Sequence, residues 1–62
     1  MKRTELIQHL SAHGCSLIRE GGRHSWWGNT ERNTRSAVPR HREINDILAR
    51  KICKDLDIPQ PQ

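Results

Sequence analysis

With 62 residues, the chain has room for one domain, and a domain of this size buries only about 60% of its unfolded surface. Only 32% of the residues are hydrophobic, which limits the core to helices packed on a small sheet. No apolar run approaches the roughly 20 residues of a membrane span, and the opening segment MKRTELIQHL is too polar for a secretory signal. We therefore expect a cytoplasmic module that does not engage membranes and gains stability from a partner.

The net charge of +4 is concentrated in the middle of the chain. Residues 19–42 contain six arginines and two glutamates, whereas the basic and acidic residues outside this range balance. The guanidinium group presents a planar fork of donors that suits phosphate. This concentration of positive charge therefore favours an anionic partner, most commonly nucleic acid. The alternative is a basic surface that only keeps the protein soluble.

The first predicted element is an amphipathic helix. Thr4 is a suitable N-cap, and Gly14 is placed to end the helix. Leu6, Ile7 and Leu10 form its apolar stripe.

Three short strands follow, at residues 15–20, 24–28 and 34–38. Gly21 and Gly22 predict a two-residue hairpin turn, because both positions of the favoured turn need a positive φ. The polar segment NTERN predicts the second connection, and Pro39 ends the third strand.

The last predicted element is a helix with Asn45 as its N-cap. Its apolar stripe is predicted to contain Ile47, Leu48, Ile52 and Leu56. We expect one domain over residues 1–58 and a disordered tail over residues 59–62. The fold class is then α+β, in the order α-β-β-β-α, with a three-stranded antiparallel sheet, both helices on one face and the other face open to water.

Strand alternation predicts which side chains occupy the open face. In HSWW, His24 and Trp26 share one face and Trp27 points to the other. Val38 is the most apolar residue of its strand, so we expect it to face the helices together with Trp27. The residues expected on the open face are His24, Trp26, Arg35 and Ala37.

An imidazole, an indole and a guanidinium on one exposed surface favour RNA as the ligand. Trp26 would stack on an unpaired base, a contact worth about 1–3 kcal/mol; the alternative is an edge residue packed on loop side chains. RNA cleavage needs a base for the 2′-hydroxyl, an acid for the leaving oxygen and positive charge at the phosphate. Imidazole titrates near neutral pH, which makes His24 the candidate catalytic residue. The candidate RNA-binding residues are Arg23, Trp26, Arg35, Arg40 and Arg42.

The second proton-transfer group is left open by the sequence. A single histidine cannot act as base and acid in one step unless it carries the proton across. The remaining candidates are Arg23, Arg35, Ser25 and water. His41 lies between two arginines. The sequence is equally consistent with two roles for it, a contact to phosphate or no role beyond being part of a basic loop.

A metal site is the weaker alternative. His9 and His13 are spaced i, i+4, with Cys15 close behind, which is a zinc-binding spacing. No fourth ligand lies at a standard spacing, so we expect solvent-facing histidines, no metal and no cofactor. Cys15 and Cys53 are expected to be small buried hydrophobes.

The segments TELIQHLSAHGCSLIREGGRHSWW, SAVPRHREI and ILARKICKDLDI together resemble the HicA toxins of bacterial toxin–antitoxin pairs, over about residues 3–58. The resemblance implies a fold like that of double-stranded-RNA-binding domains and a metal-independent endoribonuclease activity on mRNA. His24 stands at the position of the family's catalytic histidine, after Gly22 and before the core aromatic Trp27. The pattern often has a serine and a second histidine beside it, where this chain has Arg23 and Ser25.

The resemblance also implies partners. The substrate would be single-stranded mRNA, and a HicB-type antitoxin would mask the His24 face and mediate any oligomer. Because the toxin surface is basic, we expect an acidic antitoxin surface whose carboxylates pair with some of Arg23, Arg35, Arg40 and Arg42. The alternative function is a non-catalytic RNA- or DNA-binding module. The histidine distinguishes the two hypotheses, because a binding module has no need of it.

Overall fold

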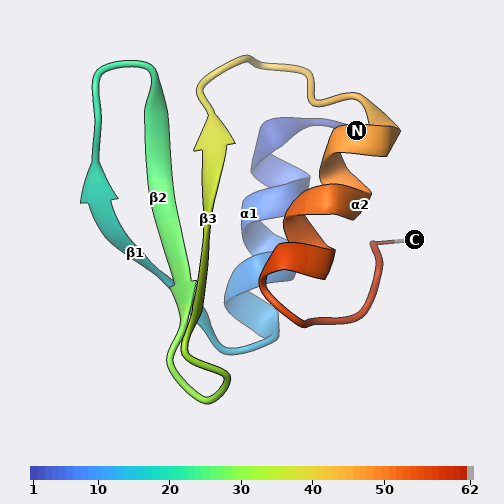
Figure 1. Cartoon of the computed structure of the whole chain (residues 1–62). Helices are drawn as coiled ribbons and strands as arrows, with labels where there is room; N and C mark the ends of the chain where they lie inside the picture. Colours follow the sequence, from blue (N-terminus) through green and yellow to red (C-terminus); the bar gives the residue numbers. More distant parts are fainter. Residues whose placement is uncertain (62) are drawn as a thin grey trace.

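The computed structural model describes residues 1–61, and its elements are α1 (Arg3–Ala12), β1 (Cys15–Glu20), β2 (His24–Asn29), β3 (Thr34–Pro39) and α2 (Asp46–Asp55). The three strands form one antiparallel sheet in the order β1-β2-β3. Figure 1 shows both helices on the same side of this sheet. The predicted fold class is therefore confirmed. None of the described helices is long and apolar enough to cross a membrane.

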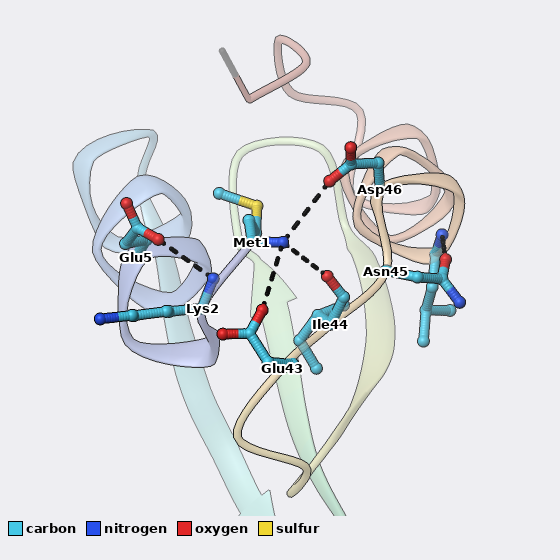
Figure 2. Close-up of polar contacts among 8 residues, drawn as sticks. Met1, Lys2, Glu5, Glu43, Ile44, Asn45 and Asp46 are labelled. Carbon is cyan, nitrogen blue, oxygen red and sulfur yellow. Dashed lines mark hydrogen bonds and ion pairs between the residues drawn. The ribbon is translucent and has the colours of Figure 1, made fainter.

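Helix α1 begins earlier than the sequence predicts. Its N-cap is Lys2, so the expected cap Thr4 lies within the first turn. The reason is Glu5, whose carboxylate accepts a 3.0 Å hydrogen bond from the Lys2 backbone N–H and satisfies that donor (Figure 2). The other end agrees with the prediction, because Gly14 follows the helix in the left-handed region with φ 84°.

Helix α2 has the predicted cap but a different buried stripe. The Asn45 side chain accepts a 2.8 Å hydrogen bond from the Leu48 N–H. Ile47, which was expected in the core, is 78% exposed. The buried positions recur at i, i+3, i+4 and i+7, and Ile47 lies off that stripe. They are Ala49, Ile52, Cys53 and Leu56.

The core lies between the two helices and the sheet face that they cover. Its largest aromatic side chain is Trp27, which is 8% exposed. Cys15 and Cys53 are both free and buried, as predicted. Burial raises the pKa of both thiols, and for Cys53 the nearby Cys15 adds to the rise. The thiols therefore stay neutral and act as small apolar side chains.

The connection between β1 and β2 differs from the predicted two-residue turn. It contains three residues, 21–23, and neither Gly21 nor Gly22 lies in the left-handed region. The Gly21 N–H donates a 2.8 Å hydrogen bond to the His24 carbonyl. A Cβ atom at Gly21 would lie 2.9 Å from the same oxygen, whereas one at Gly22 would meet nothing within 4 Å. Gly21 is thus required by close approach and not by a positive φ.

The N-terminal segment is bound to the chain just before α2. The Met1 ammonium donates a 2.8 Å hydrogen bond to the Ile44 carbonyl and lies 3.5 Å and 3.8 Å from the carboxylates of Asp46 and Glu43 (Figure 2). In return, the Ile44 N–H donates to the Met1 carbonyl at 2.8 Å. These contacts hold the connection between β3 and α2 against the start of the chain.

The expected disordered tail, residues 59–62, stays a prediction, and Gln62 lies outside the described residues. Within the described part, the His9 imidazole donates a 2.7 Å hydrogen bond to the Pro59 carbonyl. The Gln60 side chain donates to the Arg50 carbonyl at 3.4 Å.

Candidate functional site: an open sheet face

The strand faces are as the alternation predicts. Trp27 and Val38 are buried beneath the helices, and so are Ser25 and Ser36. The predicted open-face residues lie on the opposite side, since alternate residues of a strand point to opposite faces. Of these, His24 and Arg35 are exposed, and Trp26 and Ala37 are half-buried.

The register divides the open face into two regions. On β3, Pro39 lies opposite His24, whereas Arg35 lies opposite Gly28. The positions of His24 and Gly28 are four residues apart on β2, a separation of about 13 Å along a strand. Arg35 therefore does not stand beside His24, and the two side chains belong to different parts of the surface.

The first region is a surface cavity of about 560 Å³, which we call the histidine cleft. It lies where β2 begins and β3 ends, so strand ends and loops form its walls. It brings His24 together with a second histidine, His41. Its lining residues are Gly22, Arg23, His24, Pro39, Arg40 and His41.

The second region, which we call the tryptophan platform, is a cavity of about 280 Å³ lined by Ile18, Arg19, Trp26 and Arg35. Trp26 belongs to the central strand, so the alternative of an edge residue packed on loops is wrong. It presents an aromatic side chain between two guanidinium groups.

A β-bulge in β1 places Arg19 on the platform, and sequence reasoning missed it. Leu17 pairs with Trp27 and Arg19 pairs with Trp26, so Ile18 is the extra residue. Simple alternation would point Arg19 toward the helices, whereas the bulge turns it to the open face. The side chain of Ile18 occupies the space where a side chain at Gly28 would lie, so a larger residue at position 28 would require the exposed Ile18 side chain to move.

The arginines of residues 19–42 differ in their partners. Arg40 lies 3.2 Å from the Glu20 carboxylate and donates a 2.7 Å hydrogen bond to the Gly21 carbonyl. Arg32 lies 3.5 Å from Asp57. Within residues 1–61, four arginines of the central segment form no ion pair, and their charge is available to an anionic ligand. These are Arg19, Arg23, Arg35 and Arg42.

The structure removes Ser25 from the candidates for the second proton-transfer group. Ser25 is 1% exposed and faces the helices, away from His24. Its hydroxyl accepts a 2.9 Å hydrogen bond from the Arg3 guanidinium, which also donates to the Pro39 carbonyl at 2.9 Å. Arg3 thus ties the start of α1 to the two strands beneath the histidine cleft. No sequence signal pointed to this role, because it depends on contacts between distant segments.

The three residues with zinc-binding spacing make other contacts in the structure. The rings of His9 and His13 lie 4.4 Å apart, and the His13 ring donates to the His9 carbonyl at 2.9 Å. Cys15 lies in the core. No group of three or more histidine, cysteine, aspartate or glutamate side chains among residues 1–61 is placed to hold a metal ion.

The fold and this surface define a small basic α+β domain with an arginine-bearing open sheet face. A family model described as "HicA toxin of bacterial toxin-antitoxin" matches residues 3–58 of the chain. The chain therefore belongs to the HicA toxin family, as its motifs predict, and it is the toxin of a toxin–antitoxin pair with a cognate antitoxin as partner. Comparison with curated proteins and with solved structures returned no match.

Proposed function

We propose that this toxin is a metal-independent endoribonuclease that cleaves single-stranded mRNA and blocks translation, with His24 as the catalytic residue. One observation carries the proposal: an exposed imidazole lines a cleft together with Arg23 and Arg40. A histidine needed only for stability would pack into the core, whereas His24 is on the face that no helix covers. Membership of the HicA family supports the same activity.

The chemistry requires little beyond what the open face offers. The 2′-hydroxyl of RNA is an internal nucleophile, so the protein has to remove its proton, protonate the leaving oxygen and neutralise the phosphate. His24 would supply one proton transfer. Arg23 lines the same cleft and forms no ion pair within residues 1–61, so its guanidinium is available to the phosphate.

The backbone around His24 is held rigidly. Its carbonyl accepts from the Gly21 N–H at 2.8 Å, and its neighbour Ser25 is bound by Arg3 at 2.9 Å. His24 also pairs with Pro39 across the β2–β3 ladder. A catalytic side chain benefits from such support, because a misplacement of about 1 Å is enough to cost about 10²-fold in rate.

The tryptophan platform would bind the RNA to one side of the cleaved bond. Trp26 would stack on an unpaired base, and Arg19 and Arg35 would contact phosphates. Arg40, which is already bonded to Glu20 and Gly21, would serve mainly to hold the loop that carries Arg23.

A HicB-type antitoxin would neutralise the toxin by covering this open face. The cleft and the platform lie on one surface, so a single partner can mask His24 and the arginines together. The four guanidinium groups that form no ion pair within residues 1–61 favour an acidic antitoxin surface, which would speed association and make it sensitive to salt.

The test is RNA cleavage with a chelator present. Wild type should cleave a single-stranded transcript in EDTA, and His24→Ala should lose about 10²–10⁴-fold in rate, the usual contribution of a general acid or base. His13→Ala is the matched control, because it removes an exposed histidine at the C-cap of α1, away from the open face. Circular dichroism melts should be alike for all three proteins.

Two outcomes would contradict the proposal. Full activity of His24→Ala in EDTA would exclude His24 as the catalytic residue. RNA binding without any cleavage by wild type would instead favour the non-catalytic binding module.

A further inference from the structure

We infer that His41 is the second proton-transfer group of the histidine cleft, so that His24 and His41 divide the acid and base roles in RNA cleavage. This inference rests on the proposed nuclease function and adds a catalytic residue to it. It answers the question that a single histidine leaves open, namely where the second proton comes from or goes to.

The first argument is position. His24 is the first residue of β2, and Pro39, its partner across the ladder, is the last residue of β3. His41 comes two residues after Pro39, and its side chain lines the same cavity as His24. A phosphodiester in a cavity of about 560 Å³ would be within reach of both imidazoles.

The second argument is that the segment carrying His41 is held on both sides. Before it, the Pro39 carbonyl accepts a 2.9 Å hydrogen bond from the Arg3 guanidinium. After it, the Arg42 carbonyl accepts from the Arg3 backbone N–H, also at 2.9 Å. One residue of α1 therefore clamps both ends of the segment that presents His41.

Further contacts complete this support. The Ile44 backbone is bound to Met1 in both directions, and the Met1 ammonium lies near Glu43 and Asp46 (Figure 2). On the other wall of the cleft, Arg40 donates to the Gly21 carbonyl at 2.7 Å. A loop fixed at this many points holds a catalytic side chain better than a free loop does.

The third argument is that the His41 imidazole is free for chemistry. The side chain is exposed, and within residues 1–61 it makes no hydrogen bond or ion pair. The other side-chain candidates are weaker: Ser25 is buried, Arg35 is about 13 Å away along the sheet, and the guanidinium of Arg23 does not give up its proton in proteins. Besides His24, the cleft is lined by one other imidazole, that of His41, and histidine is the side chain that most often serves as a general acid or base.

The proposed step balances as follows. The neutral imidazole takes the proton of the 2′-hydroxyl, and the 2′-oxygen forms a bond to phosphorus. The bond between phosphorus and the 5′-oxygen breaks, and the protonated imidazole gives its proton to that oxygen. The products are a 2′,3′-cyclic phosphate and a 5′-hydroxyl, and the two histidines have exchanged protonation states.

The experiment measures kcat, KM and the pH–rate profile on a defined RNA oligonucleotide that contains a mapped cleavage site. Wild type should give a bell-shaped profile, and His41→Ala should lose about 10²–10⁴-fold in kcat with little change in KM. The profile of His41→Ala should keep one limb of the bell, and that of His24→Ala the other. His41→Arg keeps a positive charge but not the proton exchange, so it should be as inactive as His41→Ala. His13→Ala serves again as the control histidine.

A substrate with sulfur in place of the 5′-bridging oxygen identifies the acid, because a thiolate leaves without protonation. Of His24→Ala and His41→Ala, one should recover its cleavage rate on this substrate and the other should not. Recovery of neither would place the acid elsewhere and overturn the inference.

The remaining outcomes separate the two proposals. If His41→Arg restores kcat, or if His41→Ala changes KM alone, His41 is a phosphate contact and the inference is wrong while the nuclease stands. If wild type does not cleave RNA, the proposed function itself fails. Thermal melts of each variant confirm that the loss of rate is not a loss of fold.

Discussion

Trp26 and Trp27 are adjacent in the sequence and identical in chemistry, yet they lie in opposite environments. Trp27 packs beneath the helices at 8% exposure, and Trp26 is half-buried on the uncovered face. Around Trp27 the sheet face is covered by apolar helix side chains, whereas around Trp26 it carries Arg19 and Arg35. A strand thus gives the same side chain a structural or a binding role according to which face the helices cover.

Truncation of Trp27 is the strongest test of this contrast between the two tryptophans. Trp27→Ala should destabilise the protein by about 3–5 kcal/mol, because truncation of a core tryptophan leaves a large cavity. For a domain this small that is a large part of the total stability. Urea or thermal unfolding followed by circular dichroism measures the loss.

Trp27→Phe is the control for that experiment. The Trp27 Nε1–H is buried and has no hydrogen-bond partner within residues 1–61, so phenylalanine removes an unsatisfied donor along with some volume. The phenylalanine variant should be clearly more stable than the alanine variant. Equal stability of Trp27→Ala and wild type would mean that the faces are assigned backwards.

Trp26→Ala should give the opposite pattern. It should leave the unfolding midpoint close to that of wild type and weaken binding of a short single-stranded RNA by about 1–3 kcal/mol, the contribution of one stacked base. Fluorescence anisotropy in a His24→Ala background measures binding without cleavage. An unfolding midpoint as low as that of Trp27→Ala would show that Trp26 is a core residue.

Neutralising Arg35 should have the smallest effect of these substitutions. The effect should appear mainly in the salt dependence of the RNA-binding constant. If Arg35 contacts one phosphate, Arg35→Gln should reduce the slope of log K against log salt by about 0.7, the value for one contact to a single strand. Arg50→Gln, the same charge change on α2, is the matched control and should leave the slope unaltered. The same substitution at Arg35 should also weaken antitoxin binding, since both ligands would use one face. An unchanged slope would remove Arg35 from the RNA path.

Much of this protein was determined by short-range signals in its sequence. The order of helices and strands follows from apolar periodicity, and Asn45 and Gly14 mark helix ends through local capping. Alternation within HSWW was enough to separate Trp26 from Trp27, and the apolar Val38 of the next strand indicated that His24 lies on the open face. Each of these signals is contained within one element of the sequence, so no knowledge of the packed structure was needed.

The makeup of the site was decided only by the tertiary structure. The bulge at Ile18 brings Arg19 to the platform, and no local pattern announces it. The Arg3 guanidinium binds residues 22 and 36 positions away in the chain, which buries Ser25 and clamps the segment beyond Pro39. His41 lies in the cleft with His24 because β2 and β3 pair in a register that puts Pro39, two residues before His41, opposite His24. Contacts between distant segments depend on how all the elements pack together, and that information is spread over the whole chain.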